Sequence, residues 1–108
     1  MAFEVELSER AGRDFENAFR YIADRAPQNA KRWRTRMGQA FSQLASLAGS
    51  LGEAPESRDT QVQIRQMLVG SYRILYTIRG DVAFVLTIRH AAMQFLPADE
   101  LSRMTDDA

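Results

Sequence analysis

Residues 62–90 decide the fold, and they read VQIRQMLVGSYRILYTIRGDVAFVLTIRH. Apolar side chains alternate with other side chains over three successive runs, at 62–68, 72–78 and 82–88. Alternation with a period of two is typical of β strands, because successive side chains of a strand point to opposite faces of the sheet. The stretch therefore predicts three consecutive strands, each joined to the next by a tight turn.

The length of each turn sets which residues of neighbouring strands face each other. Opposed residues of an antiparallel pair point to the same face of the sheet. A three-residue turn centred on Gly80 sets Ile78 opposite Val82, and we expect the same turn length around Gly70. These registers gather the even-numbered apolar residues on one face, which must be covered by another part of the chain.

The odd-numbered positions form the other face, on which arginines alternate with apolar side chains. Its candidate binding residues are Arg65, Met67, Arg73, Leu75, Val85 and Arg89. Arginine makes bidentate contacts with carboxylate and phosphate groups, so this mixture indicates a docking surface for a partner. An ordinary solvated sheet face is the alternative that the pattern leaves open.

The first half of the chain predicts a strand at 2–7 followed by two helices. Ser8 suits the N-cap of a helix that ends near residue 25, and Pro27 suits the first turn of a second helix, which Gly49 or Gly52 would end. A connection this short makes the two helices an antiparallel hairpin, which must bury its apolar stripe on the even-numbered face. We therefore predict a two-layer α+β fold of order β-α-α-β-β-β, with the helical hairpin on one face of a mainly antiparallel sheet and the other face open.

The end of the chain differs in character from the rest. Residues 97–104 predict a short helix, and the acidic residues from 105 onward predict a frayed tail. We therefore divide the chain into a domain at 1–96 and a C-terminal segment at 97–108.

Composition excludes several kinds of site. The 108 residues suffice for one domain, and they include no cysteine and a single histidine, His90. Disulfides, thiolate metal sites and a cysteine nucleophile are thereby excluded, and a histidine-based metal site is disfavoured. We expect no metal and no cofactor. The N-terminus lacks the features of a signal peptide and no apolar run is long enough to span a bilayer, so we expect a cytoplasmic protein with no membrane partner.

The formal net charge is zero, but the charges are unevenly placed. Four basic residues cluster near the start of the second predicted helix: Lys31, Arg32, Arg34 and Arg36. A neutral chain argues against strong non-specific binding of nucleic acid, which depends on many phosphate contacts, but it leaves room for a small basic patch. We expect these four residues to be mostly solvated surface.

Three segments, taken together and in this order, resemble the RelE/ParE toxin superfamily of bacterial toxin–antitoxin systems. They are VELSERAGRDFENAFRYIADRAPQNAKRW, GSYRILYTI and FVLTIRHAA. The family often opens with a pattern that is matched here by Leu7, Ser8, Ala11 and Asp14, and it has a strand pattern that is matched by Tyr72, Arg73, Ile74 and Tyr76. The resemblance covers about residues 3–95 and is closer to the ParE branch.

The resemblance implies a toxin that is neutralised by an antitoxin, whose C-terminal segment wraps around it. ParE-like members are thought to inhibit DNA gyrase by binding it, and this is the function that we expect. One alternative is a RelE-like mRNA interferase that acts on the ribosome, and another is a family member of other or lost activity that still binds the antitoxin. A homodimer, or a hetero-oligomer with the antitoxin, is compatible with either function.

The nuclease alternative has three candidate catalytic residues: Arg65, Arg73 and His90. Metal-independent RNA cleavage needs a base, cations beside the phosphate and an acid for the leaving oxygen. Arg73 matches the strand arginine of the family, and His90 lies where some nuclease members carry a catalytic histidine. However, strict alternation places His90 on the helix side of the sheet, away from Arg73, and no tyrosine or basic residue follows at 91–95. We therefore favour a binding protein over an enzyme.

Overall fold

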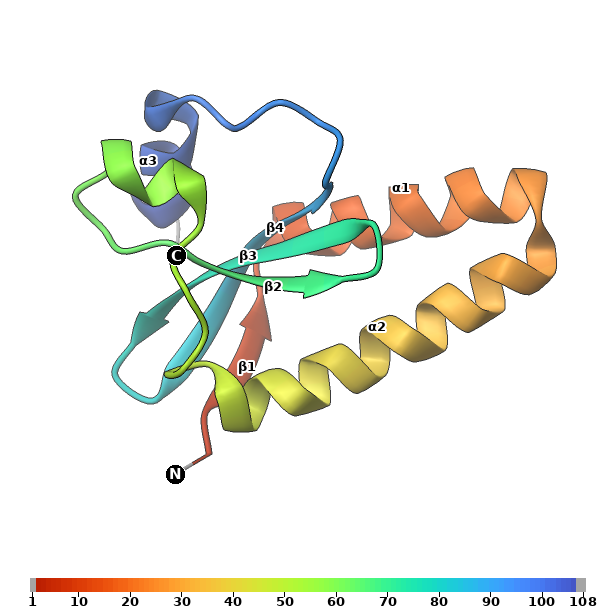
Figure 1. Cartoon of the computed structure of the whole chain (residues 1–108), viewed down its shortest axis with the longest axis horizontal. Coiled ribbons are helices and arrows are strands. Elements are labelled where there is room, and N and C mark those ends of the chain that lie inside the picture. Colours follow the sequence, from red (N-terminus) through yellow and green to blue (C-terminus); the bar gives the residue numbers. More distant parts are fainter. Residues whose placement is uncertain (1, 107–108) are drawn as a thin grey trace.

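A computed structural model describes residues 2–106 of the chain (Figure 1). The elements follow in the order β1 (Glu4–Leu7), α1 (Glu9–Arg25), α2 (Pro27–Leu47), the 3₁₀ helix η1 (Pro55–Asp59), β2 (Arg65–Val69), β3 (Tyr72–Arg79), β4 (Val82–His90) and α3 (Ala98–Asp106). Among the described residues, no helix is long and apolar enough to cross a membrane.

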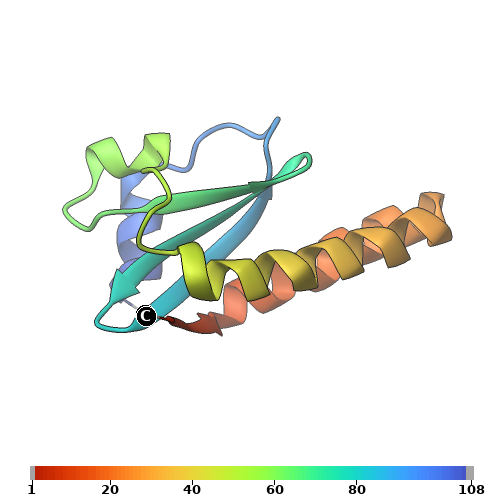
Figure 2. The same cartoon turned by 60° about the horizontal axis from the view of Figure 1, so that its bottom comes forward.

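The four strands form one sheet in the order β1-β4-β3-β2. β1 runs parallel to β4, and the other two pairs are antiparallel. The hairpin of α1 and α2 packs on one face and projects well beyond the edge of the sheet, as Figure 2 shows. The predicted α+β fold, with a helical hairpin on a mainly antiparallel sheet, is confirmed.

The pairing of β3 with β4 is interrupted by a β bulge at Leu86. Leu75 faces Thr87 and Tyr76 faces Val85, so Leu86 lies between them without an opposite residue. Because side chains alternate between faces, one extra residue reverses the alternation of β4 relative to β3. Val85 packs against the helices before the bulge, and Ile88 packs on the same face after it, while Leu86 packs on the other face of the sheet.

The predicted three-residue turns are wrong, because both hairpins turn in two residues. Arg79 faces Val82, and Val69 faces Tyr72. Each turn begins with a glycine, and these two glycines have φ angles of +58° and +60°. A positive φ at the first turn position fits a type II′ turn, whose twist matches that of the two strands and which favours glycine at that place.

The start of α1 holds the bulge in place. Ser8 is the N-cap of α1, and its hydroxyl donates to the carbonyl oxygen of Leu86 at 3.0 Å. The Oδ2 atom of Asp14 accepts hydrogen bonds from the hydroxyl of Thr87 at 2.5 Å and from the N–H of Ile88 at 3.2 Å. Backbone groups that the bulge removes from regular pairing are thus satisfied by side chains of the helix.

The core between the hairpin and the sheet is continuous. Its central side chain is Tyr76, which is fully buried and donates its hydroxyl to the carbonyl oxygen of Ala48 at 2.7 Å. The other buried members are Ala11, Met37, Ala40, Leu44, Ala48, Met67, Val69, Ile74, Ala83, Val85 and Ile88.

The second face of the sheet is also covered, so the prediction of an open face is wrong. η1 and α3 lie over this face in Figure 1. They help to enclose a second apolar cluster of Ala54, Ile64, Leu75, Leu86, Leu96, Leu101 and Met104. The predicted frayed tail is also wrong at its start, because α3 continues through Asp106 and Thr105 is buried. The remainder of that tail, 107–108, lies outside the described residues.

Two leucines of α2 test the helix-side core. Leu44 is fully buried in it, whereas Leu47 is 41% exposed on the same helix. We expect Leu44→Ala to lower the free energy of unfolding by about 2–5 kcal/mol, because it removes apolar contacts and leaves a cavity. Leu47→Ala is the matched control, with an expected loss of under about 1 kcal/mol. Urea denaturation followed by circular dichroism measures both, and equal losses would contradict this packing.

Candidate functional site

The charged centre of the second sheet face is a buried ion pair between Arg73 on β3 and Glu56 in η1. Both Nη atoms of Arg73 bind the carboxylate, each at 2.8 Å, and Arg73 is only 4% exposed. Gln66 accepts a further hydrogen bond from Arg73 at 3.1 Å. The N–H of Leu96 donates to Glu56 at 3.3 Å, and the ring of Phe95 lies 5.5 Å from the guanidinium carbon. The pair therefore ties η1 and the segment after β4 to the sheet.

Burial by itself raises the pKa of Glu56. The hydrogen bonds from Arg73 and Leu96, together with the charge of Arg73, outweigh that effect, so the pKa of Glu56 lies below its ordinary value of 4.5. The carboxylate is therefore ionised near neutral pH, and Arg73 is neutralised by a partner within the same chain.

The three candidate catalytic residues do not meet. His90 is exposed at the end of β4, where its ring packs against Tyr72 on the helix side of the sheet, with ring centres 5.2 Å apart. Its Nδ1 accepts a hydrogen bond from the N–H of Ala92 at 3.0 Å. Arg73 points to the opposite face, towards Glu56. The alternation argument placed His90 on the helix side, and it lies there.

Arg65 is separate from both. It faces Tyr76 across the β2–β3 pair, and its guanidinium donates to the carbonyl oxygen of Leu51. This contact fixes the loop that follows α2 against the start of β2. No arrangement of base, cation and acid around one point results from these positions.

The six candidate binding residues likewise do not form one surface. Met67 and Val85 lie in the helix-side core, and Leu75 lies in the second apolar cluster, so the expectation that these three side chains are exposed is wrong. The two-residue turns move Met67 and Val85 to the helix side, and η1 and α3 cover Leu75. Arg89 is half-buried and donates to the carbonyl oxygen of Gln94 at 2.8 Å.

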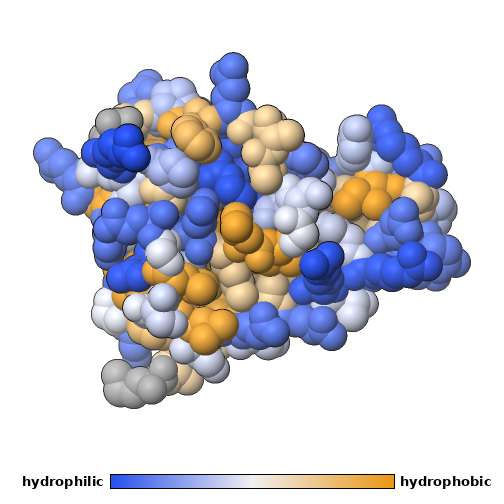
Figure 3. All heavy atoms as spheres, viewed as in Figure 1, coloured by the Kyte–Doolittle hydropathy of each residue, from blue (hydrophilic) through white to orange (hydrophobic). Residues whose placement is uncertain are grey.

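A different set of apolar side chains is exposed beside the ion pair. Leu68, Met93 and Phe95 are 64%, 52% and 61% exposed, and we call them the apolar rim. Leu68 faces Arg73 across the β2–β3 pair, and Phe95 packs over the guanidinium of Arg73. Figure 3 shows apolar side chains gathered near the middle of this face. Sequence reasoning missed the rim because its register assigned Leu68 to the covered face.

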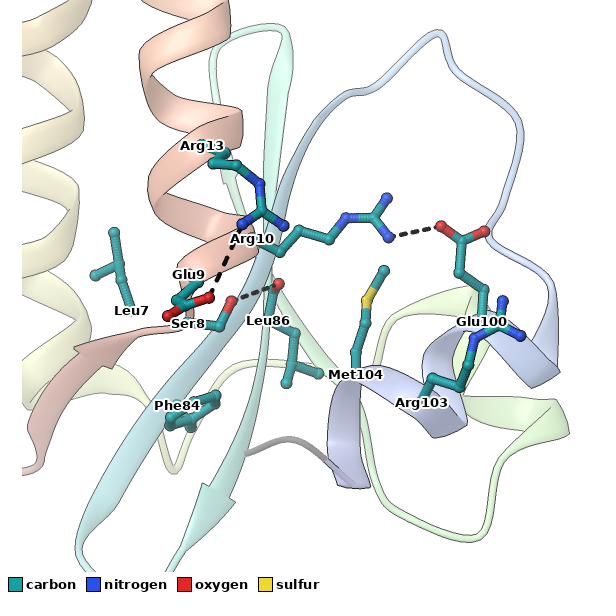
Figure 4. Close-up of a pocket in the computed structure, with 10 residues that line it drawn as sticks. All are labelled: Leu7, Ser8, Glu9, Arg10, Arg13, Phe84, Leu86, Glu100, Arg103 and Met104. Atoms are coloured by element: carbon teal, nitrogen blue, oxygen red, sulfur yellow. Dashed lines mark hydrogen bonds and ion pairs between the residues drawn. The ribbon is translucent and has the colours of Figure 1, made fainter.

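A groove of about 620 Å³ opens between the start of α1 and α3 (Figure 4). Arg10 reaches across it to Glu100, with an N–O distance of 2.6 Å. The groove is lined by Leu7, Ser8, Glu9, Arg10, Arg13, Phe84, Leu86, Glu100, Arg103 and Met104. Because the hydroxyl of Ser8 is engaged with Leu86 and with the N–H of Ala11, it is not placed as a nucleophile.

Metal chemistry has no evident site in the described part of the chain. No group of three or more His, Cys, Asp or Glu side chains there is placed to hold a metal ion. On the second sheet face Arg73 binds Glu56 and Gln66, and Arg10 binds Glu100 across the groove.

A model of a known protein family matches most of the chain. The family model described as the ParE toxin of the type II toxin–antitoxin system parDE matches residues 5–95. The match includes the bulge, the buried ion pair and Phe95 of the apolar rim, and it ends before α3. No curated protein matches the chain.

Solved structures share the fold, and two of them are toxins or come from toxin–antitoxin systems. A chain of the chromosomal ParDE toxin–antitoxin system from P. aeruginosa has a TM-score of 0.67 at 12% identity, with 82% of this chain and 96% of that chain covered. A mutant of the E. coli toxin RelE in the free state has a TM-score of 0.50 at 15% identity, with 100% of this chain and 95% of that chain covered. At these identities the two likenesses show the arrangement of the chain alone.

Removing the carboxylate of the buried pair tests its structural role. Glu56→Gln leaves Arg73 buried with an uncompensated charge, so we expect the free energy of unfolding at pH 7 to fall by about 3–5 kcal/mol. The double variant Glu56→Gln with Arg73→Met removes both charges, and we expect it to recover most of that loss. Urea denaturation of the three proteins measures the effect. A double variant as unstable as the single one would contradict the ion pair as the cause.

The same pair predicts how stability depends on pH. A carboxyl group with a lowered pKa in the folded state stabilises the fold above its unfolded-state pKa, and this contribution is lost as pH falls through the folded-state value. We therefore expect the contribution of Glu56 to be complete above about pH 4.5 and to disappear below it. Comparing the unfolding free energies of the native chain and the double variant between pH 7 and acid conditions isolates this term. If the unfolding free energies of the two proteins change with pH in parallel, this prediction is contradicted.

Proposed function

The chain belongs to the ParE toxin family of type II toxin–antitoxin systems, and on that premise we propose that it inhibits DNA gyrase by binding it and that a cognate antitoxin neutralises it. Gyrase acts on DNA inside the cell, so the proposal places the protein in the cytoplasm. A binding inhibitor needs an exposed surface and no reaction centre.

The buried Arg73–Glu56 pair is the observation that carries this proposal. RNA cleavage without a metal requires cations that are free to stabilise a phosphorane. Arg73 instead has both Nη atoms on Glu56, and His90 lies on the opposite face of the sheet. These positions support inhibition by binding over catalysis.

The alternative is a ribosome-dependent mRNA interferase that uses Arg65, Arg73 and His90. It requires Arg73 to leave Glu56, and it requires Arg73 and His90 to come together from opposite faces of the sheet. His90 is exposed, which is the observation in favour of this alternative. We keep it as the second candidate, and RNA cleavage is the measurement that separates it from the first.

The antitoxin, under this proposal, covers the apolar rim and the outer edge of β2. The N–H of Gln66 points outward and donates to the carbonyl oxygen of Gly52 at 3.1 Å. By the alternation of an antiparallel pair, the N–H and C=O of Leu68 point to the same side, and they have no backbone partner among the described residues. An extended antitoxin segment that pairs there would bury Leu68 and reach Phe95.

Purified DNA gyrase provides the direct test. We expect near-stoichiometric protein to inhibit supercoiling and the antitoxin to reverse that inhibition. His90→Ala is expected to stay within about twofold of the native chain, because a substitution outside the binding surface changes the free energy by under about 0.5 kcal/mol. The charge-free double variant, Glu56→Gln with Arg73→Met, is expected to retain inhibition as well.

Two results would overturn this function. Folded protein that leaves supercoiling unchanged, together with ribosome-dependent cleavage of mRNA that His90→Ala abolishes, would establish the interferase. Inhibition of gyrase that is lost in the double variant, while circular dichroism shows it to be folded, would place Arg73 in the binding surface.

A further inference from the structure

We propose that the outer face of α2 binds the phosphate backbone of duplex DNA. This inference goes beyond the binding of gyrase and antitoxin, and it rests on the proposed function only for the choice of DNA as the polyanion. The face is formed by Lys31, Arg32, Thr35, Arg36 and Gln39, with Arg34 at its flank, and we call it the basic face.

The charge of α2 has one sign. The helix contains four basic residues and no Asp or Glu, whereas α1 contains four Arg and four acidic residues. All four basic residues of α2 are exposed: Lys31, Arg32, Arg34 and Arg36. The ion pairs between described residues involve none of them. The cations of the basic face therefore have no ion-pair partner among the described residues.

This charge lies where it disfavours the helix. The four cations lie in the first half of α2, just beyond the first turn in which the helix dipole acts, and that turn has no acidic residue to offset them. Arg32 and Arg36 are also spaced i, i+4, at which like charges repel. The stability of the fold does not explain the arrangement, but a bound anion would offset it.

Neutral contacts hold several of these side chains without removing their charge. Arg32 donates to the amide oxygen of Asn29 at 3.2 Å, and Arg34 lies over the ring of Phe19, 5.4 Å from its centre. The guanidinium of Arg36 lies against the turn at Gly70. Side chains that are already held lose less freedom when they bind, which favours an electrostatic docking surface.

The composition of the basic face favours phosphate over a protein partner. Thr35 and Gln39 share a shallow depression of about 480 Å³ with the cations, and Figure 3 shows hydrophilic side chains along this helix. The exposed large apolar residue of α2 is Leu47, at its far end. Protein interfaces depend on apolar and aromatic anchors, whereas phosphate contacts come from Arg, Lys, Thr and Gln side chains.

The place of α2 in the fold leaves this face accessible. The hairpin projects past the sheet, and η1 and α3 lie on the opposite sheet face (Figure 2). The apolar rim is on that opposite face as well. A partner on the rim and a duplex on the basic face can therefore be bound at the same time, which suits an inhibitor of an enzyme that holds DNA.

Fluorescence anisotropy with a labelled DNA duplex of about 20 base pairs tests the inference. If four phosphates are neutralised, the logarithm of the binding constant falls against the logarithm of salt concentration with a slope of about −3.6. The triple variant Lys31→Gln, Arg32→Gln and Arg36→Gln keeps Arg34 on Phe19. We expect its slope to be about −0.9 and its affinity at about 20 mM salt to fall at least about tenfold.

A charge-matched control separates the basic face from net charge. Arg13→Gln, Arg20→Gln and Arg25→Gln remove three exposed arginines from α1, and we expect this triple variant to bind DNA within about twofold of the native chain. Equal weakening by both triple variants would overturn the inference, and so would an absence of DNA binding at low salt by folded protein. Tighter binding of duplex RNA, or of polyglutamate, would overturn the choice of DNA.

Gyrase inhibition is measured separately on the same variants. If the native chain inhibits gyrase but does not bind duplex DNA, the DNA-binding inference is wrong and the proposed function stands. If it binds DNA through the basic face but does not inhibit gyrase, the proposed function is wrong and the DNA-binding inference stands.

Discussion

The hydrogen bonds that join Ser8 and Asp14 of α1 to the bulge of β4 fix the register in which the end of β4 enters the helix-side core. Ser8 begins α1 and bonds to the carbonyl oxygen of Leu86, and Asp14, one and a half turns later, bonds to Thr87 and Ile88. The extra residue that they hold reverses the alternation of β4. As a result Ile88 joins Val85 in the helix-side core, although an even number of residues separates them, while Leu86 packs in the second apolar cluster.

The second core removes Arg73 from the exposed surface of the sheet. Arg73 would be a mid-strand cation on an open face if η1 and α3 were elsewhere. With them in place, burial requires a charge partner, and Glu56 provides one with a bidentate contact. α3 lies beyond the residues that the family model matches, yet it contributes Leu101 and Met104 to this core. The same ion pair thus closes the fold and withdraws the arginine from solvent.

What remains exposed is divided between two faces. The apolar rim borders the ion pair on one side of the sheet, and the basic face lies on the hairpin that covers the other side. The rim has the composition of a protein-binding surface and the basic face that of a phosphate-binding surface. Under the proposed function, one small domain can contact a protein and the nucleic acid that this protein holds.

The sequence by itself determined the elements and their order. Period-two alternation identified β3 and β4, helical spacing with Ser8 and Pro27 identified the hairpin, and the segments together indicated the family. These signals are local, because strand and helix periodicity act through near neighbours in the chain. Of the candidate site, the sequence singled out Arg73. Its register placed His90 on the helix side, where it lies because the bulge offsets the one-residue error in the predicted turn.

Tertiary structure decided the register of the strands, the sheet face that each side chain takes and the ion-pair partner of Arg73. A bulge adds one residue at a place that only its contacts with α1 can fix, and alternation within a strand carries no sign of it. Glu56 lies in a polar loop without periodicity, 17 residues before Arg73, so its burial follows from how η1 folds over the sheet. The sequence therefore determined which residues form strands, whereas long-range contacts determined which side of the sheet each one faces.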